Sequence, residues 1–290
     1  MLDVFFLSMG ELCSEENWLR LLKFVPTARR VDNVKGIYNA HKACAELSNT
    51  ENFWVVDADA WIVDGFSFEF EPSVKTLHWE IPETECVLVW PSQNPVNGLT
   101  YGYGGVKLFP RLPFLEKNEW LIDLSTTIGR ATVSMPDVSC ETRYNSTPES
   151  AWLGAFRECA KLASLSMIKS RVKRAQQKQE VELNELLNFL DNQDWSDDKK
   201  INYKKSRSIL IIDRYQAESS IFTYWDEIEQ CSKYRLIWCT QGWHNKNGKY
   251  SIIGAKAGSD FGLKYGDDPT SMNMINDWDW LKKEFRNVTV

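Results

Sequence analysis

Two carboxylates with one residue between them, Asp57 and Asp59, are the residues of this sequence best suited to metal chemistry. They follow the apolar run at residues 53–56, which has the pattern of a fully buried central strand in a parallel sheet. In open α/β sheets, ligands bind beyond the carboxyl ends of the strands, where both aspartates would emerge. Because alternate residues lie on the same side of a strand, the two carboxylates can share one hard divalent cation, which takes its other ligands from water and substrate phosphate. The pattern therefore indicates a metal–diphosphate site.

The same pattern has a plainer interpretation, because aspartates after a strand often form a turn or cap a helix. The apolar strand in front of the pair favours a functional site over a turn. A calcium-binding EF-hand loop is excluded. Trp61 and Ile62 stand where that loop needs an oxygen ligand and a glycine, and Phe68 replaces its closing glutamate.

Length and composition allow one large domain, or one domain with an appendage, since 43% of the 290 residues are hydrophobic. No apolar run approaches the roughly 18 residues of a membrane span. The start Met1-Leu2-Asp3 lacks the basic region of a signal peptide. Seven cysteines without a Cys-x-x-Cys pair argue against a disulfide framework and a zinc site. These features predict a cytoplasmic protein without a membrane partner.

Charge is distributed unevenly around a formal net value of −6, which gives no global attraction to nucleic acid. Residues 169–178 hold five basic residues and no acid, and residues 179–198 hold seven acids and no base. Residues 199–207 again hold five basic residues and no acid. Such blocks are usually solvated helix faces, although basic patches also follow phosphate backbones.

The periodicity of apolar residues predicts alternating strands and helices, beginning with a βαβαβ arrangement typical of nucleotide-binding sheets. We expect strands at residues 2–7, 29–31, 53–57, 66–70, 86–90, 106–109 and 235–239. We expect helices at residues 14–25, 37–47, 147–190 and 278–285. Pro26 ends the first helix, and Asp32 or Asn33 caps the second. Thr147 and Pro148 occupy the N-cap and first position of the longest helix.

Two stretches differ from this alternation. Residues 94–105 contain four glycines, so their backbone can approach a ligand closely, although Asn97-Gly98 is also a strong hairpin-turn signal. Residues 166–207 differ in polarity from both flanks, which predicts an inserted or appended helical segment.

With these elements in place, the chain resembles GT-A glycosyltransferases, whose nucleotide-binding half ends in a hydrophobic strand with Asp-x-Asp, as at residues 57–59. The helix at 34–44 has the usual donor-side position of that family. Three longer stretches are similar to glycosyltransferases of T-even-like bacteriophages: residues 94–109, 155–162 and 275–281. The resemblance covers roughly residues 1–165 and 235–286.

The resemblance implies an α/β fold with a GT-A-like mixed sheet. Its expected parts are a nucleotide-sugar-binding half at 1–110, an acceptor-side half at 111–165, a charged helical insertion at 166–207 and a C-terminal part at 208–290 that completes the site. The implied reaction moves a sugar from a nucleoside-diphosphate sugar, with UDP as the expected nucleotide, to a hydroxyl, with Mn²⁺ or Mg²⁺ on the diphosphate. The implied acceptor is 5-hydroxymethylcytosine, or a sugar already attached to phage DNA. If the protein is encoded by a phage, its compartment is the host cytoplasm.

The resemblance also implies roles for single residues. Asp59 is the expected metal ligand, Asp57 shares the ion or holds the ribose, and His244 completes the metal site unless it is an ordinary surface histidine. Glu149 takes the acceptor proton if the configuration inverts, or else complements the dipole of its helix. The expected donor- and acceptor-pocket residues are Arg29, Arg30, Lys35, Tyr101, Tyr103, Gly104, Gly105 and Lys107.

Two rival classes stay open. Phosphatases that form an aspartyl-phosphate also place Asp-x-Asp after a hydrophobic strand, and Asp267 and Asp268 offer late acids. However, Trp61 stands where those enzymes need Thr or Val, and their motif usually follows the first strand. A non-catalytic nucleic-acid-binding protein would instead use the basic blocks together with aromatic side chains.

Overall fold

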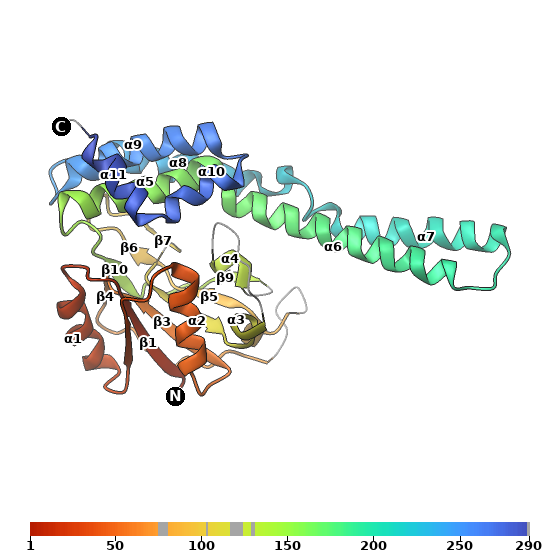
Figure 1. Ribbon diagram of the computed structural model, residues 1–290, viewed down its shortest axis with the longest axis horizontal. Coiled ribbons are helices and arrows are strands. Elements are labelled where there is room, and N and C mark those ends of the chain that lie inside the picture. The colour runs from red at the N-terminus through yellow and green to blue at the C-terminus, as the bar shows by residue number, and fades with distance from the viewer. Residues whose placement is uncertain (75–80, 103, 117–123, 129–130, 289–290) are drawn as a thin grey trace. The chain divides into compact units, whose positions relative to one another are not determined.

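The computed structural model describes residues 1–74, 81–102, 104–116, 124–128 and 131–288 (Figure 1). The chain forms two compact units: unit 1 comprises Met1–Ser164 and Ser232–Val290, and unit 2 comprises Leu165–Cys231. Unit 1 combines sheets with helices, so the predicted α/β class is confirmed. The charged segment expected at residues 166–207 lies within unit 2.

Unit 1 is built on a six-stranded sheet with the strand order β2-β1-β3-β8-β5-β9. Its strands are β1 (Asp3–Ser8), β2 (Arg29–Asp32), β3 (Asn52–Asp57), β5 (Val87–Val89), β8 (Val106–Pro110) and β9 (Thr132–Ser134). Strand β1 pairs in parallel with β2 and β3, whereas β8 pairs antiparallel with β3 and β5. The sheet is therefore mixed, and its parallel part leads to the Asp-x-Asp pair.

Strand β3 is apolar because both faces of the sheet are covered at this strand. Trp54 and Val56 pack on one face with helix α1 (Ser14–Phe24), and Phe53 and Val55 pack on the other face with α2 (Ile37–Leu47). All four β3 side chains are completely buried. The short helices α3 (Leu112–Glu116) and α4 (Ser125–Ile128) add Phe114 and Ile128 to the second face.

A second sheet has the order β4-β10-β6-β7. Its strands are β4 (Ala60–Ile62), β10 (Cys140–Thr142), β6 (Ser92–Gln93) and β7 (Thr100–Tyr101). Strand β3 ends at Asp57, and Ala58 and Asp59 form a turn into β4. The alternation that was expected to place both carboxylates on one side of the strand end therefore does not extend to Asp59, because that residue lies in the turn after β3.

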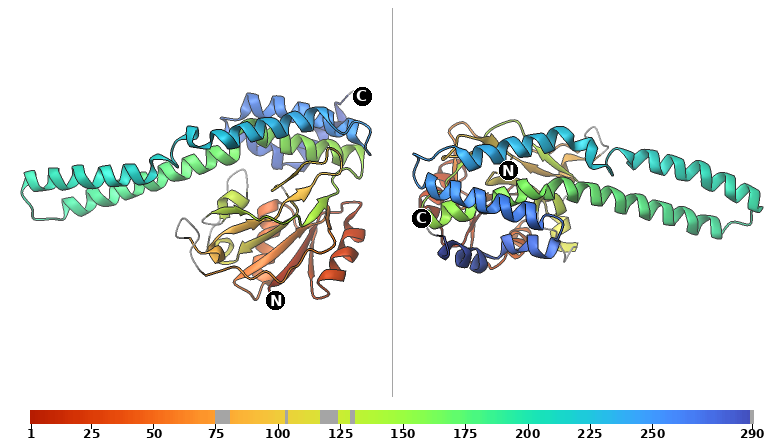
Figure 2. Two further views of the ribbon diagram at one scale, coloured as in Figure 1. Left: turned by 180° about the vertical axis from the view of Figure 1, so that it is seen from behind. Right: turned by 90° about the horizontal axis from the view of Figure 1, so that it is seen from above.

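A layer of helices in unit 1 lies across the carboxyl end of the larger sheet (Figures 1 and 2). It consists of α5 (Pro148–Ser164), α8 (Trp225–Thr240, which begins in unit 2), α9 (Gly248–Tyr265), α10 (Pro269–Asn273) and α11 (Trp278–Arg286). Helices α5 and α9 touch through their backbones. A Cβ added at Gly254, Gly258 or Gly262 would lie only 2.1 to 2.3 Å from a carbonyl oxygen of α5. Glycine at every fourth position thus allows the two helices to pack this closely.

Most elements expected from the sequence are present, with instructive exceptions. Residues 235–239 belong to helix α8 instead of a strand, because a short apolar run fits a half-buried helix equally well. Residues 66–70 form no regular strand among the described residues, although Phe66 and Phe68 pack against Trp54. Gly36, with φ of 92°, is the N-cap of α2, so neither Asp32 nor Asn33 caps that helix.

Unit 2 consists of the long helices α6 (Ser166–Asp191) and α7 (Asp197–Gln216), a short 3-10 turn (Ile221–Tyr224) and the start of α8. The expected single helix at 147–190 is divided at Leu165, whose φ of 55° ends α5 before α6 begins. Glu182 of α6 joins α7 through Arg214, at 2.8 Å, and through the hydroxyl of Tyr215, at 2.6 Å. In the described part of the chain, no helix is both long and apolar enough to cross a membrane.

Candidate functional site

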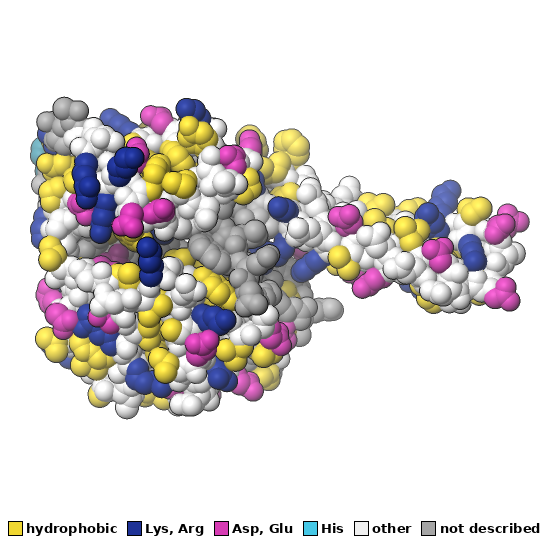
Figure 3. Space-filling view, in the orientation of Figure 1, with side chains coloured by type: hydrophobic (Ala, Val, Ile, Leu, Met, Phe, Trp, Pro, Cys, Tyr) yellow, Lys and Arg dark blue, Asp and Glu magenta, His cyan; other side chains and the backbone are white. Residues whose placement is uncertain are grey.

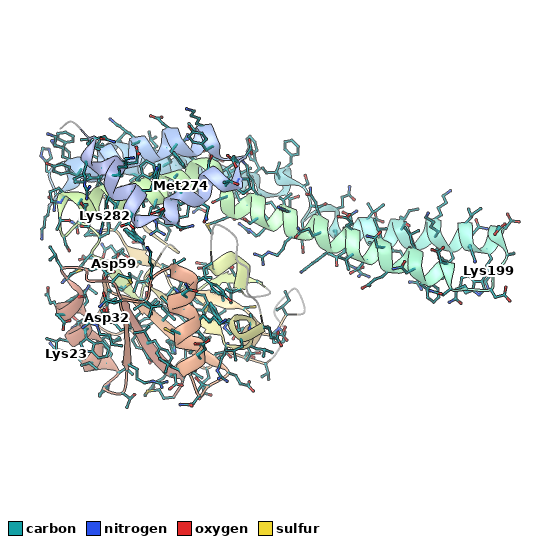
Figure 4. All side chains as sticks on the ribbon, viewed as in Figure 1. Lys23, Asp32, Asp59, Lys199, Met274 and Lys282 are labelled. Atoms are coloured by element: carbon teal, nitrogen blue, oxygen red, sulfur yellow. The ribbon has the colours of Figure 1, made fainter. Side chains whose placement is uncertain are left out.

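The site lies where three parallel strands end. Ser8, Asp32 and Asp57 are the last residues of β1, β2 and β3, and the pairing register places Ser8 beside Asp32 and Leu7 beside Asp57. Figure 4 labels Asp32 and Asp59 along this edge. Because the ends of parallel strands meet at one edge, polar side chains far apart in the sequence are brought together there.

Asp57 is held by a lysine of the neighbouring strand. The Nζ atom of Lys107, on β8, lies 3.0 Å from Oδ2 of Asp57. The side chain of Lys107 is only 14% exposed and that of Asp57 is 36% exposed, so the pair is partly shielded from water. A lysine in this position needs a carboxylate nearby. Lys107, expected to line the donor or acceptor pocket, is therefore paired with Asp57.

Asp59 has no ion pair of its own among the described residues. Burial is the main cause that raises the pKa of its carboxyl group to about 7; the negative charges of Asp57 and Glu11 add to this effect, and the positive charge of Lys107 opposes it. Among the described residues, no side chain donates a hydrogen bond or an ion pair to this carboxylate. The backbone of the turn is fixed, since the amide of Arg143 donates to the carbonyl of Asp59 at 2.6 Å. The turn thus presents an acid without an ion pair of its own, near a lysine that is paired with Asp57.

The side chains around Asp59 fit a cation held by few protein ligands better than one enclosed by several. Within the described residues, no group of three or more His, Cys, Asp or Glu side chains is arranged to hold an ion. His244, the expected third ligand, is exposed in the turn between α8 and α9. The residues present instead fit a cation that is held by one or two carboxylates, water and a diphosphate. Asp59, with Asp57 as its neighbour, is the part of the site suited to that mode.

The turn at residues 58–59 is supported by two glycines that the sequence singled out and by an asparagine that it did not. Gly104 and Gly105 permit the close approach expected of them, but to the protein itself. A Cβ on Gly105 would lie 2.7 Å from Cβ of Ala60, and one on Gly104 would lie 2.5 Å from the carbonyl oxygen of Trp90. Buried Asn17 of α1 donates to the carbonyl of Ala58 at 2.8 Å. Sequence reasoning missed Asn17, because its position reads as an ordinary helix residue.

Sequence reasoning also missed a polar group at the ends of β1 and β2. The Ser8 hydroxyl donates to Asp32 at 2.5 Å and accepts from Nε of Arg30 at 2.8 Å, while Arg30 also pairs with Glu15. Ser8 and Asp32 are each the last residue of a strand. The rule that selected Asp57, applied to the other two strand ends, would have found them.

The structure does not bring Arg29 to the site. Arg29 is the first residue of β2, where it pairs with Asp3 at 3.0 Å and donates to the carbonyl of Leu47 at 3.0 Å. The strand ends three positions later, at Asp32, which is about 10 Å away along an extended chain. Lys35 lies beyond that end, where its exposed ammonium is 4.0 Å from Asp279.

The expected acceptor-side residues occupy different settings. Glu149 is half-buried in the first turn of α5, whose N-terminus is capped reciprocally by Thr147 and Ser150 at 2.9 Å. The hydroxyl of Tyr101 donates to Glu158 at 2.7 Å and accepts from Nε1 of Trp238 at 3.0 Å, so this tyrosine joins α5 to α8. Tyr103 lies outside the described residues.

A separate groove of about 400 Å³ lies between α5, α9 and α11. It is lined by Trp152, Phe156, Ala257, Asp260, Phe261, Lys264, Trp280, Glu284, Asn287 and Val288. Neither aspartate of the Asp-x-Asp pair lines it.

In comparisons with protein-family models, curated proteins and solved structures, the chain matches none. The functional argument therefore rests on the geometry of the strand ends.

Proposed function

We propose that the chain is a metal-dependent glycosyltransferase that moves a sugar from a nucleoside-diphosphate sugar, with UDP as the nucleotide, to a hydroxyl. The observation that carries this proposal is Asp59, a carboxylate that forms no ion pair among the described residues and follows the carboxyl edge of parallel strands. Such an acid is suited to a divalent cation whose other ligands come from a diphosphate. Because the charge of Asp57 is balanced by Lys107, Asp59 is the proposed principal ligand.

A GT-A-like architecture is supported by the parallel order β2-β1-β3, by the antiparallel strand β8 beside β3 and by the second sheet that begins directly after Asp59. Asp32, whose side chain is 41% exposed at the end of β2, is the proposed contact to the nucleoside, and the buried hydroxyl of Ser8 orients it. Its carboxylate oxygens accept hydrogen bonds from a base or a ribose.

The proposed mechanism divides the work between two ends of the site. When bound, Mn²⁺ or Mg²⁺ supplies positive charge to a departing diphosphate. Asp59 and Asp57 orient that charge, and Glu149 takes the proton of the acceptor hydroxyl. The proposed acceptor is a hydroxymethylated pyrimidine of DNA or a sugar attached to it, which rests on the likeness of residues 94–109 to phage glycosyltransferases.

Calorimetry of Asp59→Asn tests the metal site, with Asp64→Asn as a matched control at an exposed aspartate. We expect Asp59→Asn to lose at least tenfold of its Mn²⁺-dependent UDP affinity, and the control to retain it. Because the pKa of Asp59 is about 7 and a ligand carboxylate must be deprotonated, affinity should fall below pH 7 and level off above it. Undiminished UDP affinity in Asp59→Asn would contradict the proposal.

Incubation with a panel of nucleotide sugars and Mn²⁺, followed by mass spectrometry of hydroxymethylated DNA digests, tests the reaction. Glu149→Gln should lower transfer by about 10² or more while UDP binding survives. An unchanged rate would leave Glu149 as an acid that only complements the dipole of α5. Phosphate release from a small phosphomonoester, without sugar transfer, would favour the phosphatase class instead.

A further inference from the structure

Helix α11 presents a basic face to solvent. Lys282, Lys283 and Arg286 are all exposed, and at 100° per residue they fall within an arc of about 100°. Trp278, at the start of the same helix, is 48% exposed. Three cations and a large aromatic side chain are thus displayed on a single short helix.

The orientation of this face is fixed by the opposite side of the helix. Leu281 is completely buried, and Trp280 and Phe285 pack with Trp152 and Phe156 of α5. Side chains that anchor α11 in this way leave its charged positions outward. Figure 3 shows several Lys and Arg side chains, with Asp and Glu side chains among them, over the region of α11, and Figure 4 labels Lys282 on the helix side of the site and Asp59 on the sheet side.

The cations of this face are available to a partner. Among the described residues, Lys282, Lys283 and Arg286 form no ion pair with an acid. Asp279, which shares their side of the helix, lies 4.0 Å from Lys35 in an exposed pair. Such exposed pairs exchange readily with other ions, since they contribute about 0 to 1 kcal/mol.

We propose that this face of α11 binds the phosphate backbone of a nucleic-acid acceptor next to the site at the strand ends, an inference that rests on the proposed function. The chain as a whole is negative, so a polyanion needs a local excess of positive charge. Lysine and arginine supply phosphate contacts. The guanidinium of Arg157 lies over the ring of Trp278, 5.0 Å from its centroid, and the part of this tryptophan that stays exposed adds aromatic surface on which a base can stack.

The basic blocks of unit 2 are less suited to this task, although the sequence drew attention to them. Arg171 pairs bidentately with Glu227, and the guanidinium of Arg207 lies over the ring of Tyr203, 5.4 Å from its centroid. The aminium of Lys199 lies over the ring of Trp195, 4.1 Å from its centroid. Part of the positive charge of unit 2 is therefore satisfied within unit 2 itself.

The test compares two variants that lose equal charge. In the first, Lys282, Lys283 and Arg286 are replaced by glutamine. In the matched control, the exposed Lys178, Lys204 and Lys205 of unit 2 are replaced by glutamine. Anisotropy of fluorescently labelled duplex DNA is followed from about 50 to 200 mM salt, where each lost phosphate contact lowers the log–log slope by about 0.9. We expect the α11 variant to lose two to three units of slope and at least tenfold in affinity, and the control to change little.

Binding of UDP with Mn²⁺ is measured in parallel, because it reports the fold and the donor site without DNA. We expect both variants to bind UDP like the parent. Equal loss of DNA affinity in the control, or an unchanged slope in the α11 variant, would overturn the inference. A parent that binds UDP with Mn²⁺ but no DNA would overturn the inference and leave the proposed function standing. A parent that binds DNA through α11 but no UDP would overturn the proposed function and leave the assignment of the α11 face as a nucleic-acid contact standing.

Discussion

Units 1 and 2 are folded by different forces. In unit 1, the side chains of β3 are completely buried between two apolar clusters. In unit 2, by contrast, α7 buries none of its described side chains completely, and Leu210 is 54% exposed. Unit 1 is therefore stabilised mainly by burial, and unit 2 by helix formation with a few pairs between its helices. The difference indicates that unit 1 is the unit that can hold chemical groups rigidly.

The titratable groups follow the same division. Burial raises the pKa of Asp59 to about 7 and lowers the pKa of His41 to about 4, and both residues belong to unit 1. In unit 2, the pKa of Tyr215 is raised mainly by its hydrogen bond to Glu182, near the surface. Perturbed acids and bases cluster at functional sites, so this contrast favours unit 1 as the site of chemistry.

The largest expected difference between the units concerns truncation of a side chain. Trp54→Ala should lower the free energy of unfolding by about 3 to 5 kcal/mol, because it empties the space between Trp90, Phe66 and Phe68. Leu210→Ala, on the surface of unit 2, should cost less than about 0.5 kcal/mol. Urea denaturation followed by near-ultraviolet circular dichroism measures both. Comparable losses at the two positions would break the comparison.

Acid should destabilise unit 1 through His41. This buried ring packs against Phe109 and Phe114, and its folded-state pKa of about 4 lies below the ordinary value of 6.5. The unfolded chain therefore binds the proton first, so the contribution is complete above pH 6.5 and is lost as the pH falls toward 4. The loss is up to about 3 kcal/mol by linkage. Asp59, whose pKa is raised to about 7, contributes a slope of opposite sign between pH 7 and 4, so the His41 contribution is measured as the difference between the parent and His41→Phe in urea titrations across this range. The parent should lose up to about 3 kcal/mol relative to the variant as the pH falls.

The smallest effect is expected where unit 2 relies on a surface pair. The side chain of Arg214 is 62% exposed, so its ion pair with Glu182 should contribute less than about 0.5 kcal/mol. A double-mutant cycle of Arg214→Ala and Glu182→Gln isolates the pair from the hydrogen bond of Tyr215. A coupling energy above about 2 kcal/mol would show that unit 2 depends on this contact as unit 1 depends on its core.

Local patterns in the sequence predicted the strands that carry the site, since full burial leaves an apolar run at 53–56 and the strand ends at Asp57. They failed where the answer depended on contacts between distant segments. Lys107 neutralises Asp57 because β8 lies beside β3, and no local signal specifies that neighbour. Arg29 lies at the opposite end of β2 from the site, because it begins this strand instead of ending it. The run at 235–239 is helical because Trp238 packs on Tyr101 and Tyr144 from a helix.

The glycines that join α9 to α5 have a consequence for how this protein can diverge. Every single-nucleotide change in a glycine codon that alters the amino acid adds a side-chain carbon. At Gly254, Gly258 and Gly262 that carbon would collide with a carbonyl oxygen of the opposing helix, which no rotamer can relieve. Substitutions in α9 are therefore disfavoured at these three glycines, while exposed positions between them, such as Lys256 and Asp260, are free to change. Homologues should thus retain this spacing even where the rest of α9 has become unrecognisable.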